Sequence, residues 1–261
     1  MGFQKFVAVG DSCAEGLDDP YPDHSQYRGW ADFVAGRLAQ DEPGFRYANL
    51  AVRGRRLDQI VVEQLPAAER HEPDLIALFG GGNDVMSHGW DARTVARRVD
   101  AAIRRCTSIA PVVVTFTLSD IAHRLPFGAR MRPRVTALND AIREASVSYG
   151  ARLVDLWPDR AVHDPRYFGP DRLHLSEAGH LRVAGHVLDR LRIDHDGGWL
   201  APLPGLPSRP SLRADARWFW REVVPVAVQR LRNRVVGRSP GDGFLPKRPE
   251  LLPVAFSEVH L

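Results

Sequence analysis

Cysteine is scarce in this sequence, since Cys13 and Cys106 are the only two among 261 residues. Two cysteines supply neither a disulfide framework nor a four-cysteine metal site. We expect both thiols to be reduced and to pack as small hydrophobic groups, with Cys13, next to Ser12, as a candidate target of thiol reagents.

Long apolar runs are missing as well. None approaches the roughly 18 residues that a membrane helix needs. The first residues lack the basic segment, apolar run and cleavage site of a secretory signal. Phe6 stands where a myristoylation signal requires serine or threonine. We therefore expect a cytoplasmic location.

Several binding motifs are also absent. No Gly-x-Gly-x-x-Gly follows the first predicted strand, where a dinucleotide site requires it, and no Gly-x-Ser-x-Gly elbow surrounds Ser12. We find no zinc-ligand spacing and no internal repeat, and we interpret Asp23 and His24 as part of a solvated loop. The sequence predicts neither a cofactor nor a metal ion.

Excess charge is confined to one end of the chain. The whole sequence has 35 Lys and Arg against 32 Asp and Glu. Residues 195–261 hold ten of these basic residues and six of the acidic ones, so residues 1–194 are nearly neutral. This balance argues against nucleic-acid binding by the main part of the chain.

What the sequence does contain is a regular alternation of strand and helix patterns. Short apolar runs predict buried strands, and segments with apolar residues at helical spacing separate them. This alternation predicts an α/β fold with a five-stranded parallel sheet, helices on both faces and right-handed connections. The predicted strands cover residues 6–9, 45–51, 74–79, 112–116 and 153–157. We interpret residues 118–133, which show no clear period, as a loop over the site.

Polar blocks follow several of these strands, at the edge where an open α/β sheet binds its ligand. Ser12 follows the first strand and is a candidate nucleophile. His174 is the candidate base, and Asp171 is near enough to fix the tautomer of its ring. The amides of Ser12 and Gly54 and the side chain of Asn83 are candidate donors to an oxyanion. Together these groups supply what acyl transfer requires.

At these blocks the sequence resembles the SGNH hydrolase family, also called GDSL-type esterases and lipases. The resemblance covers roughly residues 5–192, with Cys13 replacing the family's leucine after the serine. It implies a three-layer, flavodoxin-like fold and a cofactor-free serine esterase acting on a small-molecule ester through an acyl-enzyme intermediate. The family's hallmark Ser, Gly, Asn and His map onto Ser12, Gly54, Asn83 and His174.

Two other interpretations remain open at this stage. One is a flavodoxin-like binding module that uses residues 80–82 for a phosphate. The other is a catalytically silent member of the family that binds a membrane surface or a protein partner through its arginine-rich tail. The presence of all four hallmark residues argues against the silent member.

The remainder of the chain divides by composition. We predict a catalytic domain over residues 1–194, a Pro/Gly-rich linker over 195–210, a basic amphipathic helical extension over 211–238, and an extended or disordered tail over 239–261. Pro225 should kink or split the helix. The extension, residues 209–238 in its widest form, could contact an anionic membrane or pack on the catalytic domain or another subunit. We favour packing.

Overall fold

The computed structural model of the protein describes residues 2–20, 27–120, 128–207, 212–235 and 237–254. Its strands are β1 (Lys5–Gly10), β2 (Arg46–Asn49), β3 (Leu75–Phe79), β4 (Val112–Phe116), β5 (Arg152–Val154) and β6 (Arg248–Pro253). Its α-helices are α1 (Ser12–Glu15), α2 (Trp30–Asp41), α3 (Leu57–Gln59), α4 (Leu65–Arg70), α5 (Gly82–Val85), α6 (Ala92–Ile109), α7 (Gly128–Tyr149), α8 (Glu177–Leu191), α9 (Leu212–Trp218) and α10 (Val224–Val235). The shorter helical turns are η1 (Ile60–Gln64), η2 (Arg160–His163), η3 (Pro165–Tyr167), η4 (Gly197–Trp199) and η5 (Phe219–Val223).

The six strands form one sheet in the order β5-β4-β3-β1-β2-β6. The pairs from β5 to β2 are parallel, as the crossovers predicted. β6 is antiparallel to β2 and comes from the C-terminal tail. The predicted count of five strands was therefore one too low, because alternating prolines and charges in β6 hide its pairing from a sequence pattern.

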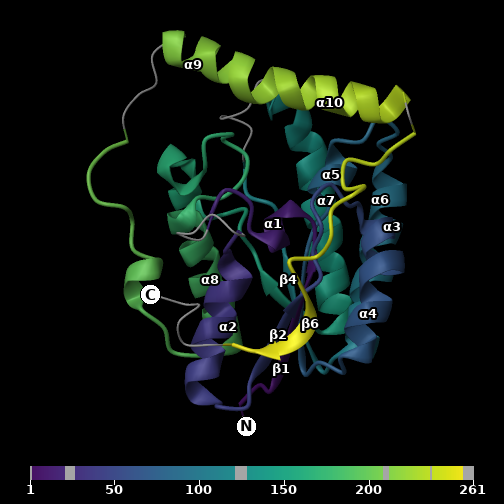
Figure 1. Ribbon diagram of the computed structural model, residues 1–261, viewed down its shortest axis with the longest axis vertical. Coiled ribbons are helices and arrows are strands. Elements are labelled where there is room, and N and C mark those ends of the chain that lie inside the picture. Colours follow the sequence, from purple (N-terminus) through teal and green to yellow (C-terminus); the bar gives the residue numbers. More distant parts are fainter. Residues whose placement is uncertain (1, 21–26, 121–127, 208–211, 236, 255–261) are drawn as a thin grey trace.

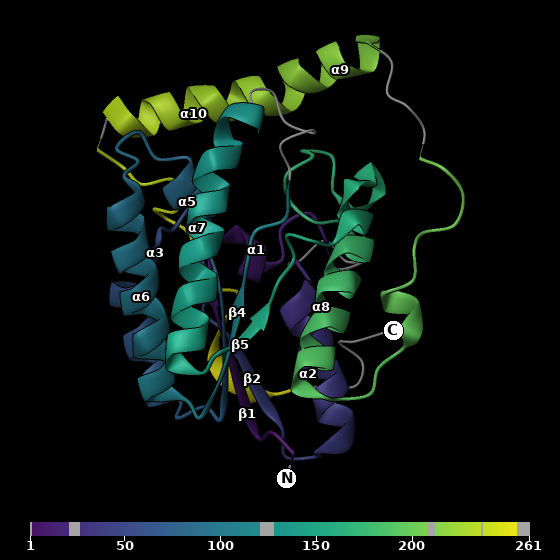
Figure 2. The same ribbon diagram turned by 180° about the vertical axis from the view of Figure 1, so that it is seen from behind.

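Helices cover both faces of the sheet, which makes three layers (Figures 1 and 2). On one face α2 and α8 bury a core with Trp30, Phe79 and Phe116 at its centre, and Phe79 stacks on Phe116. On the other face the run from α3 to α4, together with α6 and α7, covers the second side of β1, β3 and β4. The continuous apolar strands follow from burial on both faces.

Two predictions concern irregular segments. Residues 118–133 are not all loop, because α7 already begins at Gly128 and includes Pro133 in its second turn. Residues 121–127 of that prediction lie outside the described residues. Pro225 was expected to kink or split the C-terminal helix. The α-helical pattern of α9 gives way to the π-helical turn η5 directly before α10, and Pro225 is the second residue of α10. The hydrogen-bond pattern therefore changes next to Pro225, but the chain stays helical.

The C-terminal segment returns to the sheet by way of the site. In both ribbon views α9 and α10 lie across the end of the molecule at which the parallel strands finish. The chain then runs down to β6, where the Nζ of Lys247 donates to the Oδ2 of Asp32 at 2.5 Å and to the carbonyl of Tyr27 at 2.8 Å. The Lys247 and Asp32 side chains are 8% and 10% exposed, so this ion pair is almost fully buried from solvent.

Candidate active site

Ser12 lies where β1 turns into α1, at the carboxyl edge of the sheet. Asp11 caps α1, because its Oδ1 accepts from the backbone N–H of Cys13 at 3.0 Å. The N–H of Asp11 donates to the carbonyl of Phe79 at 3.2 Å, which ties the turn to the end of β3. The turn that carries Ser12 is therefore held by two neighbouring strands.

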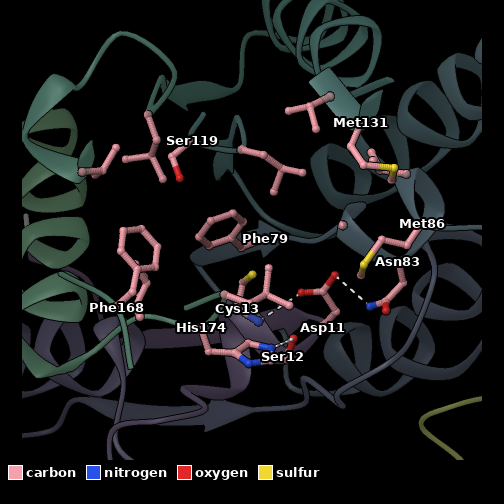
Figure 3. Close-up of a pocket in the computed structure, with 18 of the residues that line it drawn as sticks. Asp11, Ser12, Cys13, Phe79, Asn83, Met86, Ser119, Met131, Phe168 and His174 are labelled. Atoms are coloured by element: carbon pink, nitrogen blue, oxygen red, sulfur yellow. Dashed lines mark hydrogen bonds between the residues drawn. The ribbon is translucent and has the colours of Figure 1, made fainter. Parts of the chain in front are cut away.

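The loop before α8 brings two more predicted residues to Ser12. The Nε2 of His174 lies 2.8 Å from the Oγ of Ser12 (Figure 3). Its Nδ1 lies 2.5 Å from the Oδ2 of Asp171. The Oδ1 of Asp171 accepts from the backbone N–H groups of Leu173 and His174 at 2.8 and 2.9 Å. These two bonds fix the carboxylate, so one oxygen always faces the imidazole.

The electrostatics of this set follow from its contacts. Burial lowers the pKa of His174, but the hydrogen bond and charge of Asp171 outweigh it, and the pKa is raised. For Asp171 burial acts upward, but the hydrogen bond from His174 and its charge lower the pKa to about 2. Near neutral pH the set therefore contains an ionised Asp171 beside an imidazole with increased proton affinity.

Gly54 and Asn83 follow β2 and β3, the two strands that flank β1. The Nδ2 of Asn83 donates to the Oδ2 of Asp11 at 3.3 Å and to the carbonyl of Arg55 at 3.2 Å, so its amide is held between both neighbouring turns. Gly54 has φ +77°, and a Cβ there would lie 2.7 Å from the N of Gly241. The left-handed turn and the close C-terminal segment both require glycine.

The triple-glycine block before Asn83 also has a packing reason. Gly81 has φ +105°, and a Cβ there would meet the side chain of Leu138 on α7 at 3.0 Å. Asp84, fully buried, accepts from the N–H of Leu57 at 2.9 Å and from Arg98 at 3.0 Å. These contacts fix the turn that presents Asn83.

Sequence reasoning missed Asp18, which lies beside the same loop. A Cβ on Gly169 would come within 2.3 Å of the Oδ2 of Asp18, so the carboxyl group of Asp18 packs directly against the backbone of Gly169. Burial and the neighbouring Asp171 raise the pKa of Asp18 to about 6. Three potential metal ligands, one atom each from Asp18, Asp171 and His174, lie within 4.8 Å of one another. A metal ion bound there would compete with the hydrogen bond between His174 and Asp171. In the sequence Asp18 is one acid among several in a polar loop, and nothing there distinguishes it.

Cys13 lies next to Ser12, but its thiol is expected to be a poor nucleophile. Burial and the adjacent Asp11 raise the pKa of its thiol well above the ordinary value. Because the thiolate is the reactive form, we expect little reaction with thiol reagents near neutral pH.

A cavity of about 760 Å³ opens beside Ser12 and His174. Figure 3 shows Phe79, Met86, Met131 and Phe168 around it, and most of its wall is apolar. Phe219 and Val223 of the C-terminal segment belong to this lining. The polar groups of the wall include Asp159, and its carboxylate pairs with both Arg182 and His186 at 2.6 to 3.1 Å.

Comparison with known proteins places the chain among the hydrolases of ester bonds that share this α/β fold. The model of the GDSL-like lipase/acylhydrolase family matches residues 8–182, which is more than half of the chain, so the protein belongs to this family. The family is the one that the sequence blocks indicated. No curated protein sequence matches the chain.

Solved structures share the fold. LAE5, described as an α/β hydrolase from the metagenome of Lake Arreo, is 21% identical with a TM-score of 0.60, covering 72% of this chain and 94% of its own. A variant of Axe2, an acetylxylan esterase from Geobacillus stearothermophilus, is 16% identical with a TM-score of 0.62, covering 75% of this chain and 98% of its own. Axe2 variants with a serine, a histidine or an aspartate replaced by alanine are described as catalytic mutants.

Proposed function

We propose that this esterase uses Ser12 as nucleophile, His174 as general base and Asp171 as the residue that orients His174. The Oγ of Ser12 attacks the ester carbonyl carbon while the Nε2 of His174 takes the hydroxyl proton. The tetrahedral intermediate then expels the alcohol, which receives that proton from His174. Water, deprotonated by the same ring, attacks the acyl-enzyme and releases the acid, which restores Ser12.

The observation that carries this proposal is the unbroken hydrogen-bond path from the Oγ of Ser12 through His174 to Asp171, with steps of 2.8 and 2.5 Å. Such a path occurs only if the proton on the imidazole is at Nδ1, which leaves Nε2 free to accept from Ser12. The catalytic serine, histidine and aspartate of Axe2 are an independent parallel in a protein of the same fold.

We assign the oxyanion donors to the N–H groups of Ser12 and Gly54 and the side-chain amide of Asn83. Among the described residues, neither of these backbone N–H groups donates to a protein acceptor, so both are free for a developing charge. Asn83 lines the cavity beside Ser12, but its amide donates to Asp11 and to the carbonyl of Arg55, so it must give up one of these bonds to reach the oxyanion. The two backbone N–H groups need no such exchange as charge develops.

The test is hydrolysis of p-nitrophenyl acetate, butyrate and laurate by the wild-type protein and by Ser12→Ala. We expect Ser12→Ala to lower kcat by at least about 10³-fold, because the acyl-enzyme cannot form. Ser119→Ala is the matched control, since Ser119 is another serine in the cavity wall and should keep wild-type activity. Equal loss in both variants, or none in Ser12→Ala, would exclude Ser12 as the nucleophile.

The hydrogen-bonded set also bears on the alternative of a catalytically silent binding module. A silent protein has no requirement for an ionised Asp171 that fixes the tautomer of His174. Absence of wild-type hydrolysis on all three esters would nevertheless favour the silent module and direct attention to the C-terminal segment.

A further inference from the structure

The C-terminal helical segment, residues 212–235, forms part of the roof of the cavity. Its inner side contributes Phe219 and Val223 to the apolar wall. Arg172, in the loop that carries His174, holds it in place. The Nη2 of Arg172 donates to the Oδ1 of Asp215 at 2.7 Å, and its guanidinium carbon lies 4.3 Å from the centre of the Trp218 ring. The roof is thus fastened to the same loop that carries the candidate base.

The outer side of the roof is basic. Arg213, Arg217 and Arg221 recur every fourth residue, so they share one helix face, and all three are exposed. The two acids of the segment, Asp215 and Glu222, are half-buried instead. Charge is therefore sorted across the helix, with the described arginines outside and the acids toward the protein.

Apolar side chains accompany these arginines at the surface. Trp220 is 69% exposed, and Val226 and Val228 are 52% and 43% exposed. Exposed tryptophan and valine among arginines suit an interface where apolar groups enter the acyl boundary and cations meet anionic headgroups. An acidic protein surface would match the arginines but gives no reason for an exposed tryptophan above an acyl-sized cavity.

We propose that the roof docks on an anionic phospholipid surface and that the substrate is a long-chain acyl ester drawn from that surface into the cavity. The substrate part of this proposal rests on the proposed esterase function, whereas the docking part does not depend on it. The roof follows the part of the chain that matches the family model, residues 8–182, so it is a feature of this chain outside the shared catalytic region.

Docking is tested by sedimentation with vesicles of phosphatidylcholine alone and with one third phosphatidylglycerol. Full-length Ser12→Ala protein is used, so lipid hydrolysis plays no part. We expect binding to the anionic vesicles only, and at least about tenfold weaker binding after R213E/R217E/R221E. R70E/R104E/R190E makes the same charge change at exposed arginines near the ends of α4, α6 and α8, at the opposite edge of the sheet, and should bind as before.

Three results would overturn the docking. They are equal binding to neutral vesicles, unchanged binding of the roof variant, and equal loss in both charge variants, which would show only a net-charge effect. Because these measurements need no turnover, failure of the esterase function cannot be confused with failure of docking.

The substrate class is tested with soluble p-nitrophenyl acetate and octanoate. We expect the wild type to have the higher kcat/KM on octanoate, and F219S/V223S to lower the octanoate-to-acetate ratio by about threefold or more. V62S/V147S, at exposed valines far from the cavity wall, should keep the ratio. Preference for acetate, or an unchanged ratio in F219S/V223S, would refute the long-chain assignment, whereas inactivity on both esters would refute the esterase function itself.

Discussion

Replacement of Asp171 by asparagine should reverse the tautomer of His174. The Oδ1 of Asp171 accepts two backbone N–H bonds, from Leu173 and His174. An asparagine would keep its carbonyl oxygen at that position, because an NH₂ group cannot accept. The NH₂ group would then face the Nδ1 of His174 and donate to it. The ring proton would move to Nε2, and Nε2 could no longer accept from Ser12.

The expected cost follows from this tautomer. In serine proteases the equivalent change lowers kcat by roughly 10⁴-fold. For this protein we expect a fall in kcat of about 10³–10⁴-fold, which corresponds to about 4–5.5 kcal/mol of lost transition-state stabilisation. Loss of the carboxylate should also lower the pKa of His174, so the acid limb of kcat/KM should move to lower pH.

The assay is the pH profile of octanoate ester hydrolysis by wild type, Asp171→Asn and Asp171→Ala. Asp171→Ala removes the anchor but donates nothing to Nδ1, so it should be the less damaged of the two variants. A fall of less than about tenfold in Asp171→Asn, or an unmoved acid limb, would refute the role of Asp171 in fixing the tautomer.

Three further variants test other contacts. Asp18→Asn should move the acid limb of kcat/KM to lower pH, because the charge of Asp18 raises the pKa of His174; an unmoved limb would contradict this. Burial lowers the pKa of His180 to about 3, so the free energy of unfolding has its full value above pH 6.5 and falls by about 3 kcal/mol by pH 4. Urea titrations should show a weaker pH dependence of this free energy for His180→Gln, whose amide can accept from the N–H of Trp30 and donate to the carbonyl of Leu17. Lys247→Met should destabilise by about 3–5 kcal/mol by leaving Asp32 buried without its partner, and a urea midpoint equal to wild type would show that β6 contributes little.

The sequence predicted the parts of the fold that depend on local pattern. Continuous apolar runs such as residues 112–116 predicted the strands, and the segments with apolar residues at helical spacing between them predicted the helices. Because parallel strands finish at one edge, the positions of Ser12, Asn83 and Gly54 after adjacent strands were enough to bring them to the same side of the sheet.

The features that escaped prediction depend on contacts between distant segments. β6 has no apolar alternation, and its place is set by pairing with β2 and by the ion pair of Lys247 with Asp32, 215 residues away. Asp18 gains its raised pKa because the fold buries its carboxyl group and brings Asp171 next to it. The apolar spacing of the C-terminal helix was visible, but the cavity beneath Phe219 was not.

The C-terminal segment and the site cannot be separated by cutting the chain after Asp194. The segment lines the cavity at Phe219, packs Gly241 on the turn of Gly54, and completes the ion pair of Asp32. Deletion would remove all three contacts together, and a loss of activity could not be assigned to any one of them. A single change is more informative.

Gly241→Ala provides such a change, because a Cβ at Gly241 would lie 2.3 Å from the carbonyl oxygen of Arg53 and must push the two segments apart. If the turn of Gly54 supplies an oxyanion donor, kcat should fall severalfold while KM stays near wild type, since an oxyanion contact forms only in the transition state. Gly243→Ala, at a glycine of the same segment whose added Cβ would meet nothing within 4 Å, is the control for backbone strain alone. Equal kcat in the two variants would show that the C-terminal segment does not affect the chemical step. Its roles would then be limited to the roof of the cavity and the edge strand β6.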